Sequence, residues 1–580
     1  MPPRHAAAGR RLDRRRFLTG SALGLGAAAL PAWANGNGGA AAPAAIARGD
    51  LAAVERLAGL AFSDADRDLM LEDVTELRAD YEALRGVRLD NAVPPAIRFD
   101  PALPGAPPPA GASSFRLLPA PPPVRPADPE ALAFLPAVTL GRLVASGQIS
   151  SVELTRLYLE RLKRYDPLLQ AVVTLTEERA LAEAERMDRE LAAGRPRGPL
   201  HGVPWAAKDL LAARGYPTTW GAGPFKEQAF DFDATVVERL GRAGAVLVAK
   251  TTLGELAWGD VWFGGTTKNP WNLEQGSSGS SAGSAATTAA GLVGFAVGSE
   301  TLGSIVSPCT RTGATGLRPT FGRVPRHGAM ALSWTMDKLG PICRSVEDCA
   351  AVLAAIAGPD GRDPTATDAP FVWGPERDPR RLRVGYVKAL FEAEPEAERK
   401  EWHAFDLRSL ETLRGLGVEL LPLELPALPI QAMGLILSVE AAAAFDELTR
   451  SGADDRLVRQ IRRAWPNVFR VARTVPAVEY VQANRVRTLL MEEMAQRFAA
   501  VDLYVAPTYG GDNLLITNLT GHPAVVLPNG FRKDGTPTSI TFTGGLWREA
   551  DLLAFAKLYQ DATDFHLRRP RLAPPAPAPS

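Results

Sequence analysis

The chain has 580 residues, a length that suits more than one ordinary domain. Apolar residues make up 46% of it, which is enough for a large buried core and too much for a disordered protein. Lys and Arg number 65 and Asp and Glu also number 65, so the formal net charge is zero. The basic excess typical of a nucleic-acid binder is missing, and a small or weakly charged substrate fits the composition better.

The cysteines and histidines do not predict a cross-linked or metal-bound protein. The three cysteines are too few for a disulfide framework, although Cys343 and Cys349 are either small buried residues or a pair joined in an oxidising compartment. The six histidines are scattered without metal-ligand spacing. We therefore expect no metal and no organic cofactor.

Residues 1–34 have the pattern of an export signal. Arg14 and Arg15 precede Phe17 and Leu18, an apolar run spans residues 18–30, and residues 32–34 supply an A-x-A cleavage site. This resembles a twin-arginine signal peptide. A membrane anchor is the alternative, but the run is short and rich in Gly and Ala for a bilayer span. We expect a periplasmic or secreted protein without a stable membrane anchor.

Two segments separate this signal from the main globular region. Residues 35–93 begin as a Gly/Ala/Asn-rich linker and continue as a helical extension, with leucines at amphipathic spacing and a cap-like Ser63-Asp64-Ala65-Asp66. Residues 94–130 are a Pro-rich connector that should be extended, because proline does not fit helix interiors. The last ten residues, 571–580, are expected to form a disordered tail.

Residues 131–570 alternate between helical and strand-like patterns. Amphipathic helices are predicted near residues 153–165 and 177–193, and a strand at residues 245–248. A helix start at residues 284–290 is followed by a second strand at residues 292–297. This alternation predicts an α/β domain with one central sheet.

A stretch rich in small and hydroxylated residues, 276–316, has the composition of a catalytic cradle. Apolar runs interrupt it, so it is not a flexible linker but a set of tight loops whose N–H groups can face an anion. No Walker lysine follows its glycines, and no Gly-x-Ser-x-Gly elbow with downstream Asp and His is evident. A serine there would need another base, and Lys208, after a short apolar run, is a candidate. Taken alone, a lysine at a strand end is usually a solvated surface charge.

Several motifs taken together resemble the amidase signature family over about residues 131–567. They are HGVPWAAKD at residues 201–209, the Gly/Ser stretch some seventy residues later, and GATGLRPTFGR at residues 313–323. The resemblance implies an α/β amidase fold with a central mixed sheet flanked by helices, preceded here by an N-terminal helical extension. That extension loosely resembles the small C subunit of the tRNA-dependent amidotransferase, and a plain helical extension explains it equally well.

The family resemblance also implies a Ser–Ser–Lys triad. Its lysine falls on Lys208, its nucleophile on Ser304, and its cis-serine, 24 residues before the nucleophile, on Ser280. Spacing disfavours the competing Ser277 and Ser278. The resemblance further assigns the oxyanion hole to the backbone N–H groups of Thr301, Leu302, Gly303 and Ser304, and support of the lysine and cis-serine to Ser284, Gly279 and Ser281. A homodimer is compatible with it.

The chain departs from the family pattern near the nucleophile. Leu302 and Ala282 replace glycines, and Val306 stands where an arginine is common. Valine cannot pair with a carboxylate, which favours a neutral or apolar amide as the small-molecule substrate. Trp220, Trp258 and Trp262 either line the substrate pocket or pack in the core. The alternatives to an amidase are an ester or carbamate hydrolase, a catalytically silent binding protein, and one subunit of a transamidation complex.

Overall fold

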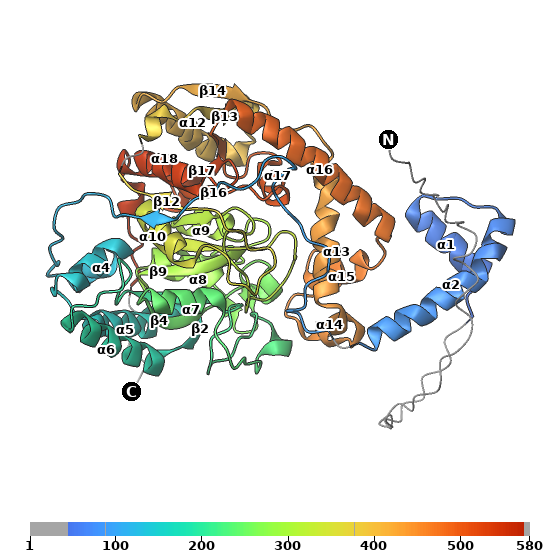
Figure 1. Ribbon diagram of the computed structural model, residues 1–580, viewed down its shortest axis with the longest axis horizontal. Helices are drawn as coiled ribbons and strands as arrows, with labels where there is room; N and C mark the ends of the chain where they lie inside the picture. The colour runs from blue at the N-terminus through green and yellow to red at the C-terminus, as the bar shows by residue number, and fades with distance from the viewer. Residues whose placement is uncertain (1–44, 88, 376–377, 574–580) are drawn as a thin grey trace, which may run out of the picture. The chain divides into compact units, whose positions relative to one another are not determined.

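The computed structural model describes residues 45–87, 89–375 and 378–573 and divides at Gly86/Val87 into two compact units (Figure 1). The predicted signal peptide, most of the following linker and the last seven residues lie outside the described residues. None of the described helices is both long and apolar enough to cross a membrane.

The first unit consists of two helices, α1 (Arg48–Ala58) and α2 (Asp64–Arg85). The predicted cap of α2 is present, since the Asp66 N–H donates to Ser63 Oγ at 3.2 Å and the Ser63 N–H donates to Asp66 Oδ2 at 3.0 Å. Each group thus satisfies a backbone donor that the first helical turn leaves without a partner.

The second unit is built on a mixed sheet of eleven strands, as the family resemblance implies. Parallel pairs lie at one end of the sheet and near the other, whose edge strand runs antiparallel to its neighbour, and antiparallel pairs join the two regions through the centre. In order across the sheet, the strands are β14 (Leu420–Leu423), β13 (Val384–Val387), β15 (Leu503–Pro507), β17 (Pro537–Gly544), β16 (Ala524–Phe531), β10 (Thr315–Arg318), β11 (Lys338–Cys343), β9 (Phe295–Glu300), β3 (Pro204–Lys208), β4 (Val246–Thr251) and β2 (Val172–Leu175).

Helices cover this sheet, with α6 packed on β4, α8 on β9 and β11, and α18 on β16 and β17. The α-helices of the second unit are α3 (Pro129–Ala133), α4 (Ala137–Ala145), α5 (Ser151–Leu169), α6 (Glu177–Ala192), α7 (Thr235–Arg242), α8 (Ala282–Ala289), α9 (Val306–Thr312), α10 (Val346–Ile356), α11 (Lys388–Glu392), α12 (Lys400–Gly415), α13 (Leu435–Ala444), α14 (Asp446–Arg450), α15 (Trp465–Ala472), α16 (Ala477–Ala500), α17 (Asn513–Leu519) and α18 (Glu549–Asp561). Three short strand pairs accompany them: β1 (Ser114–Phe115) with β12 (Val372–Trp373), β5 (Val261–Trp262) with β6 (Gly265–Thr266), and β7 (Lys268–Asn269) with β8 (Asn272–Gly276).

Most predicted elements of the second unit are found, with shifted ends. Helices α5 and α6 cover the two predicted amphipathic helices, and β4 contains most of the predicted strand. The strand predicted at residues 292–297 begins only at Phe295. Residues 290–294 instead close the end of α8, where Gly291 has φ +65° and the Leu292 N–H donates to Thr287 O. The Pro-rich connector contains one short strand, β1, paired in parallel with β12.

The three cysteines are buried, and all three are free thiols. Cys349 Sγ donates a weak hydrogen bond to Thr315 O at 3.8 Å. Cys343 and Cys349 are therefore small buried residues and not a disulfide pair.

Candidate active site

The candidate site forms where β3 and β9 end side by side. These strands are parallel neighbours, with Ala207 opposite Val297, so their carboxyl ends meet at one edge of the sheet. Lys208 is the last residue of β3, and the segment after Glu300 leaves β9 toward α9. The loop before α8 reaches the same edge and carries Ser280. The fold therefore brings three distant sequence motifs together.

Lys208 has no exposed surface and is surrounded by hydroxyl groups. Its Nζ lies 2.8 Å from Ser280 Oγ, 2.9 Å from Ser299 Oγ and 3.1 Å from Ser281 Oγ. Burial lowers the pKa of Lys208 well below its usual value, although the negative charges of Asp337 and Glu300 oppose this shift. A lysine in this setting is easily deprotonated and can then accept a proton.

The loop that carries Ser280 is held against neighbouring backbone. The peptide bond between Gly279 and Ser280 is cis. A Cβ at Gly279 would lie 1.8 Å from Gly259 O, so only glycine fits there. The Ser281 N–H donates to Ser304 O at 3.0 Å, which ties this loop to the one that carries the predicted nucleophile.

Ser304 is only 7% exposed, and the loop around it is organised by the carboxylate of Glu300. Glu300 Oε2 accepts the N–H groups of Ile305 and Val306, each at 2.9 Å. Its Oε1 pairs with Arg318 Nη1 at 2.8 Å and accepts Asn518 Nδ2 at 2.9 Å. Burial acts to raise the pKa of Glu300, but Arg318 and these donors outweigh it and hold the pKa at about 2.

The predicted oxyanion segment contains unpaired donors. Among the hydrogen bonds of the described residues, none is donated by the backbone N–H of Leu302, Gly303 or Ser304. None joins the hydroxyls of Ser280 and Ser304 either, so the link between their loops is the one from Ser281 N–H to Ser304 O. Gly303 has φ +83°, a conformation that favours glycine. At this position the chain has the glycine that the family pattern also has.

Ser284 was expected to support Lys208 and Ser280, but its hydroxyl has other partners. Ser284 Oγ is 2.8 Å from Thr251 Oγ1 and contacts neither Lys208 nor Ser280 by a hydrogen bond. Ser281, also expected to support the lysine, does contact it. Ser299 is a further contact that the sequence reasoning missed. It occupies the first position of the motif that ends in Ser304, so its place in that motif was the available signal.

None of the expected substrate-binding residues is among those that line the cavity described below. Val306 is 1% exposed in an apolar cluster with Ile305 and Cys309. Trp220 packs in the core, with its ring 4.7 Å from that of Phe225. The remaining two tryptophans also have neighbours of their own: Trp258 lies under the Arg459 guanidinium, and Trp262 contacts Phe263 edge-on.

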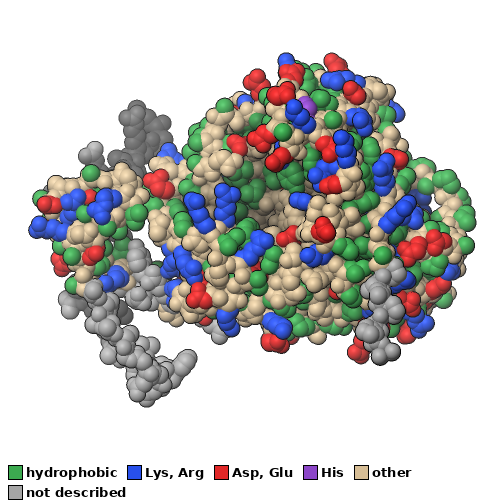
Figure 2. All heavy atoms as spheres, turned by 180° about the vertical axis from the view of Figure 1, so that it is seen from behind, with side chains coloured by type: hydrophobic (Ala, Val, Ile, Leu, Met, Phe, Trp, Pro, Cys, Tyr) green, Lys and Arg blue, Asp and Glu red, His purple; other side chains and the backbone are tan. Residues whose placement is uncertain are grey.

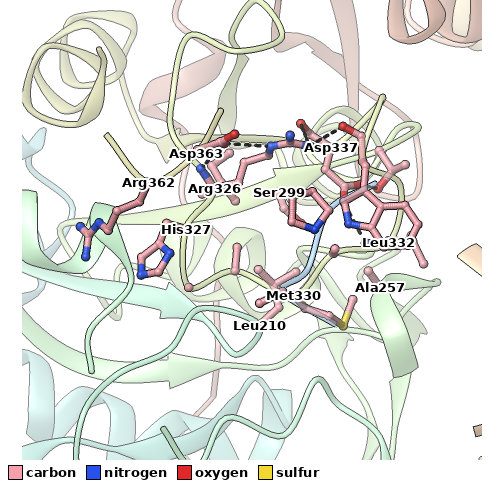
Figure 3. A pocket seen from close by; sticks show the side chains of 18 of the residues that line it. Leu210, Ala257, Ser299, Arg326, His327, Met330, Leu332, Asp337, Arg362 and Asp363 are labelled. Carbon is pink, nitrogen blue, oxygen red and sulfur yellow. Dashed lines mark hydrogen bonds and ion pairs between the residues drawn. The ribbon is translucent and has the colours of Figure 1, made fainter. Parts of the chain in front are cut away.

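A cavity of about 100 Å³ is lined in part by Ser299 and Thr301. Ser299 is also a hydrogen-bond partner of Lys208, so the cavity lies next to the buried lysine. In Figure 3, Arg326 and Asp363 are joined at one side of it, and Leu210 and Met330 lie lower in the view. Figure 2 shows one face of the larger unit, hollowed near its centre, with charged side chains around the rim.

Asp337 connects this cavity to the predicted oxyanion segment and was not singled out from the sequence. Its Oδ1 accepts the Thr301 hydroxyl at 2.6 Å, and its Oδ2 accepts the N–H groups of Leu332 and Ser333 at 2.8 and 2.9 Å. Burial raises the pKa of Asp337, while Arg326 acts in the opposite direction. The carboxylate thus fixes one cavity wall relative to the loop that leads to Ser304.

Comparison with known proteins supports an amide-cleaving site. The sequence profile of a family described as Amidase matches residues 153–517. The chain is 33% identical to the A subunit of glutamyl-tRNA(Gln) amidotransferase from Thermosynechococcus vestitus, over 75% of this chain and 99% of that protein. It is 30% identical to a peptide amidase in complex with the competitive inhibitor chymostatin, with a TM-score of 0.67 over 76% of this chain and 100% of the other. The native peptide amidase of Stenotrophomonas maltophilia is also 30% identical, with a TM-score of 0.65 over 75% of this chain and 98% of the other.

Proposed function

The chain belongs to the amidase family, and on that basis we propose that it hydrolyses a carboxylic amide through an acyl-enzyme on Ser304. The observation that carries the proposal is the fully buried Lys208 amine, 2.8 Å from the Ser280 hydroxyl, at the edge of the sheet where the Ser304 loop begins. A buried amine with a lowered pKa can serve as the base that a serine nucleophile needs.

The proposed reaction moves protons along one line of three groups. Ser304 Oγ bonds to the carbonyl carbon as its proton passes to Ser280 Oγ and the Ser280 proton passes to Lys208 Nζ. The proton then returns through Ser280 to the departing nitrogen, and the C–N bond breaks. Water attacks the acyl ester by the same relay, which releases a carboxylate and restores the Ser304 hydroxyl. The hydrogen bond between the Ser304 and Ser280 hydroxyls forms when substrate binds, since catalytic hydrogen bonds often tighten only in the complex.

The oxyanion is proposed to bind the backbone N–H groups between Thr301 and Ser304. Three of these groups, at residues 302–304, donate to no acceptor among the described residues, which supports the assignment. Loss of one such donor typically costs about 3–4 kcal/mol of transition-state stabilisation. The Leu302 side chain packs partly into an apolar cluster with Leu515 and Ile516, so replacing a glycine there leaves the backbone of the loop available.

The sequence at residues 1–34 supports export, and we propose that the amidase acts in the periplasm or outside the cell. The amidotransferase relatives act on tRNA by their printed name, whereas an exported enzyme would not meet charged tRNA. We therefore propose simple hydrolysis rather than transamidation. Fusing residues 1–40 to a folded reporter and replacing Arg14 and Arg15 with Lys would test export: the reporter should stay in the cytoplasm only after the replacement.

A panel of aliphatic, aryl, amino-acid and peptide C-terminal amides, assayed for released ammonia or amine, tests the proposed chemistry. Ser304→Ala should abolish turnover, and Lys208→Ala should lower it by several orders of magnitude, with the fold intact by circular dichroism. The matched control is Ser277→Ala, because Ser277 lies in the same loop but its hydroxyl donates to the Ser278 carbonyl and, among the described residues, not to Lys208, Ser280 or Ser304. Normal turnover by Ser304→Ala, or an equal loss in Ser277→Ala, would refute the assignment.

A further inference from the structure

We propose that residues 90–99, here called the strap, form the outer wall of the cavity and limit the size of the apolar substrate group that enters it. Asn91 is the positioning residue of this strap. The inference rests on the proposed function, because it takes the cavity beside Ser299 and Thr301 as the place where one side of the amide binds. Two strap residues, Ala92 and Pro94, contribute to the cavity lining.

Asn91 attaches the strap to Ala331, another residue that lines the cavity. Its Nδ2 donates to Ala331 O at 2.9 Å, and its Oδ1 accepts the Ala331 N–H at 2.7 Å. The side-chain amide therefore satisfies both backbone groups of one residue, as a neighbouring strand would. Nδ2 also lies 3.5 Å from Ala444 O, at the end of α13. Because Ala331 itself lines the cavity, this contact sets how far the strap stands from it.

The other end of the strap is held independently. Arg98 Nη1 donates to Pro364 O at 2.8 Å, and Pro364 is another cavity-lining residue. The Arg487 guanidinium lies 3.6 Å from the centre of the Phe99 ring, which also meets Phe321 edge-on at 5.1 Å. Between the two ends, Pro94 and Pro95 restrict the backbone. The strap is thus a stiff segment fixed at both ends across the cavity.

The chemistry of the cavity favours an apolar occupant. Much of its lining is apolar, including Leu210, Met330, Leu332 and Leu339. Its charged residues already have partners: Arg326 pairs with Asp363 at 3.2 Å, Arg362 with Glu238 at 2.9 Å, and Asp337 accepts three donors. An ionised substrate group would have to compete with these pairs, whereas an alkyl or aryl group displaces only water.

The strap precedes residues 153–517, the part of the chain that matches the family profile. The catalytic loops and the other cavity-lining residues, from Leu210 to Pro364, lie inside that match, whereas the strap lies outside it. Substrate size would then be set in this chain by a segment that carries no catalytic group.

Rates of Ser304 labelling by methyl, butyl and decyl fluorophosphonates test the inference on the full-length protein. A capped cavity should favour butyl over decyl by about tenfold or more, the scale of discrimination that apolar pockets reach. Asn91→Ala should reduce this preference at least about fivefold, because the strap loses its spacing from Ala331. With amides of matched chain length, the change should appear in KM, while kcat stays within about threefold.

Two further variants complete the test. Asn467→Ala removes an exposed Asn-to-backbone hydrogen bond, to Arg462 O, at a residue that does not line the cavity, and should leave the preference unchanged. Ala92→Trp adds bulk to the cavity lining and should slow butyl labelling at least about fivefold, with methyl labelling retained. If both Asn91→Ala and Ala92→Trp are labelled at Ser304 with the wild-type preference for chain length, the strap inference is overturned and the proposed function stands. Failure of every probe to label wild-type Ser304 would overturn the proposed function, and the strap inference with it.

Discussion

Replacing Glu300 with Gln should separate the support of the nucleophile loop from general stability. The Glu300 carboxylate is fully buried, accepts the N–H groups of Ile305 and Val306, and pairs with Arg318. A glutamine can keep one oxygen toward the loop, but its NH₂ group would then face the Arg318 guanidinium, donor against donor. Arg318 would retain only the carbonyl of His522 as an acceptor.

The expected cost of this substitution follows from the pKa of Glu300. The pKa falls from 4.5 to about 2 in the fold, and at 1.36 kcal/mol per pKa unit this corresponds to about 3 kcal/mol. Because the folded pKa is depressed, this stabilisation is present above pH 4.5 and is lost as the pH falls toward 2. Removing one partner of a buried ion pair typically costs a similar amount, about 3–5 kcal/mol.

Thermal unfolding and amide turnover measured together test the prediction. Glu300→Gln should lower the unfolding midpoint at pH 7 by several degrees and kcat by at least about tenfold. Wild type should approach the stability of the variant as the pH falls below 4.5. Glu549→Gln is the matched control, because Glu549 is equally buried, pairs with Arg323 at 2.6 Å and lies on α18. It should lose stability and keep kcat. A Glu300→Gln protein that melts with wild type, or loses no more activity than Glu549→Gln, would refute the reasoning.

Three further predictions concern the lysine and the loops around it. The rate constant kcat/KM should rise with pH through the lowered pKa of Lys208, since only the neutral amine accepts a proton, and a rising limb at or above the ordinary pKa of 10.5 would contradict this. Gly279→Ala should reduce turnover at least about 100-fold, because its Cβ would meet Gly259 O, while Gly241→Ala, in open space on α7, should be nearly silent; equal activities would exclude the close approach. Ser299→Ala should lower kcat by roughly 10–100-fold and Ser284→Ala by less than about threefold, and the reverse order would mean that Ser284 supports the lysine after all.

The sequence predicts the parts of this protein that local pattern encodes. Amphipathic spacing is enough for α5 and α6, and motif order is enough for the family and its mixed sheet. The strand prediction was wrong for residues 292–294, because Gly291 turns the chain at the end of α8. Apolar side chains alone do not distinguish a buried turn from a strand.

Contacts that depend on tertiary packing could not be predicted from the sequence. Asp337 meets Thr301 across 36 residues, and Asn91 meets Ala331 across 240. Neither pair has a spacing signal, because each depends on how strands and loops stack rather than on any local period. The same limit applies to Ser299 and Ser284: both are serines in the same small-residue stretch, and only the structure shows which of them contacts Lys208.

The most direct test of the central claim is mass spectrometry of the intact protein, quenched during turnover of an amide whose acyl group leaves slowly. The account predicts a mass increase equal to the acyl group, carried after digestion by the peptide that contains Ser304 and absent from Ser304→Ala. An acyl group on another residue, or steady turnover by Ser304→Ala, would contradict it.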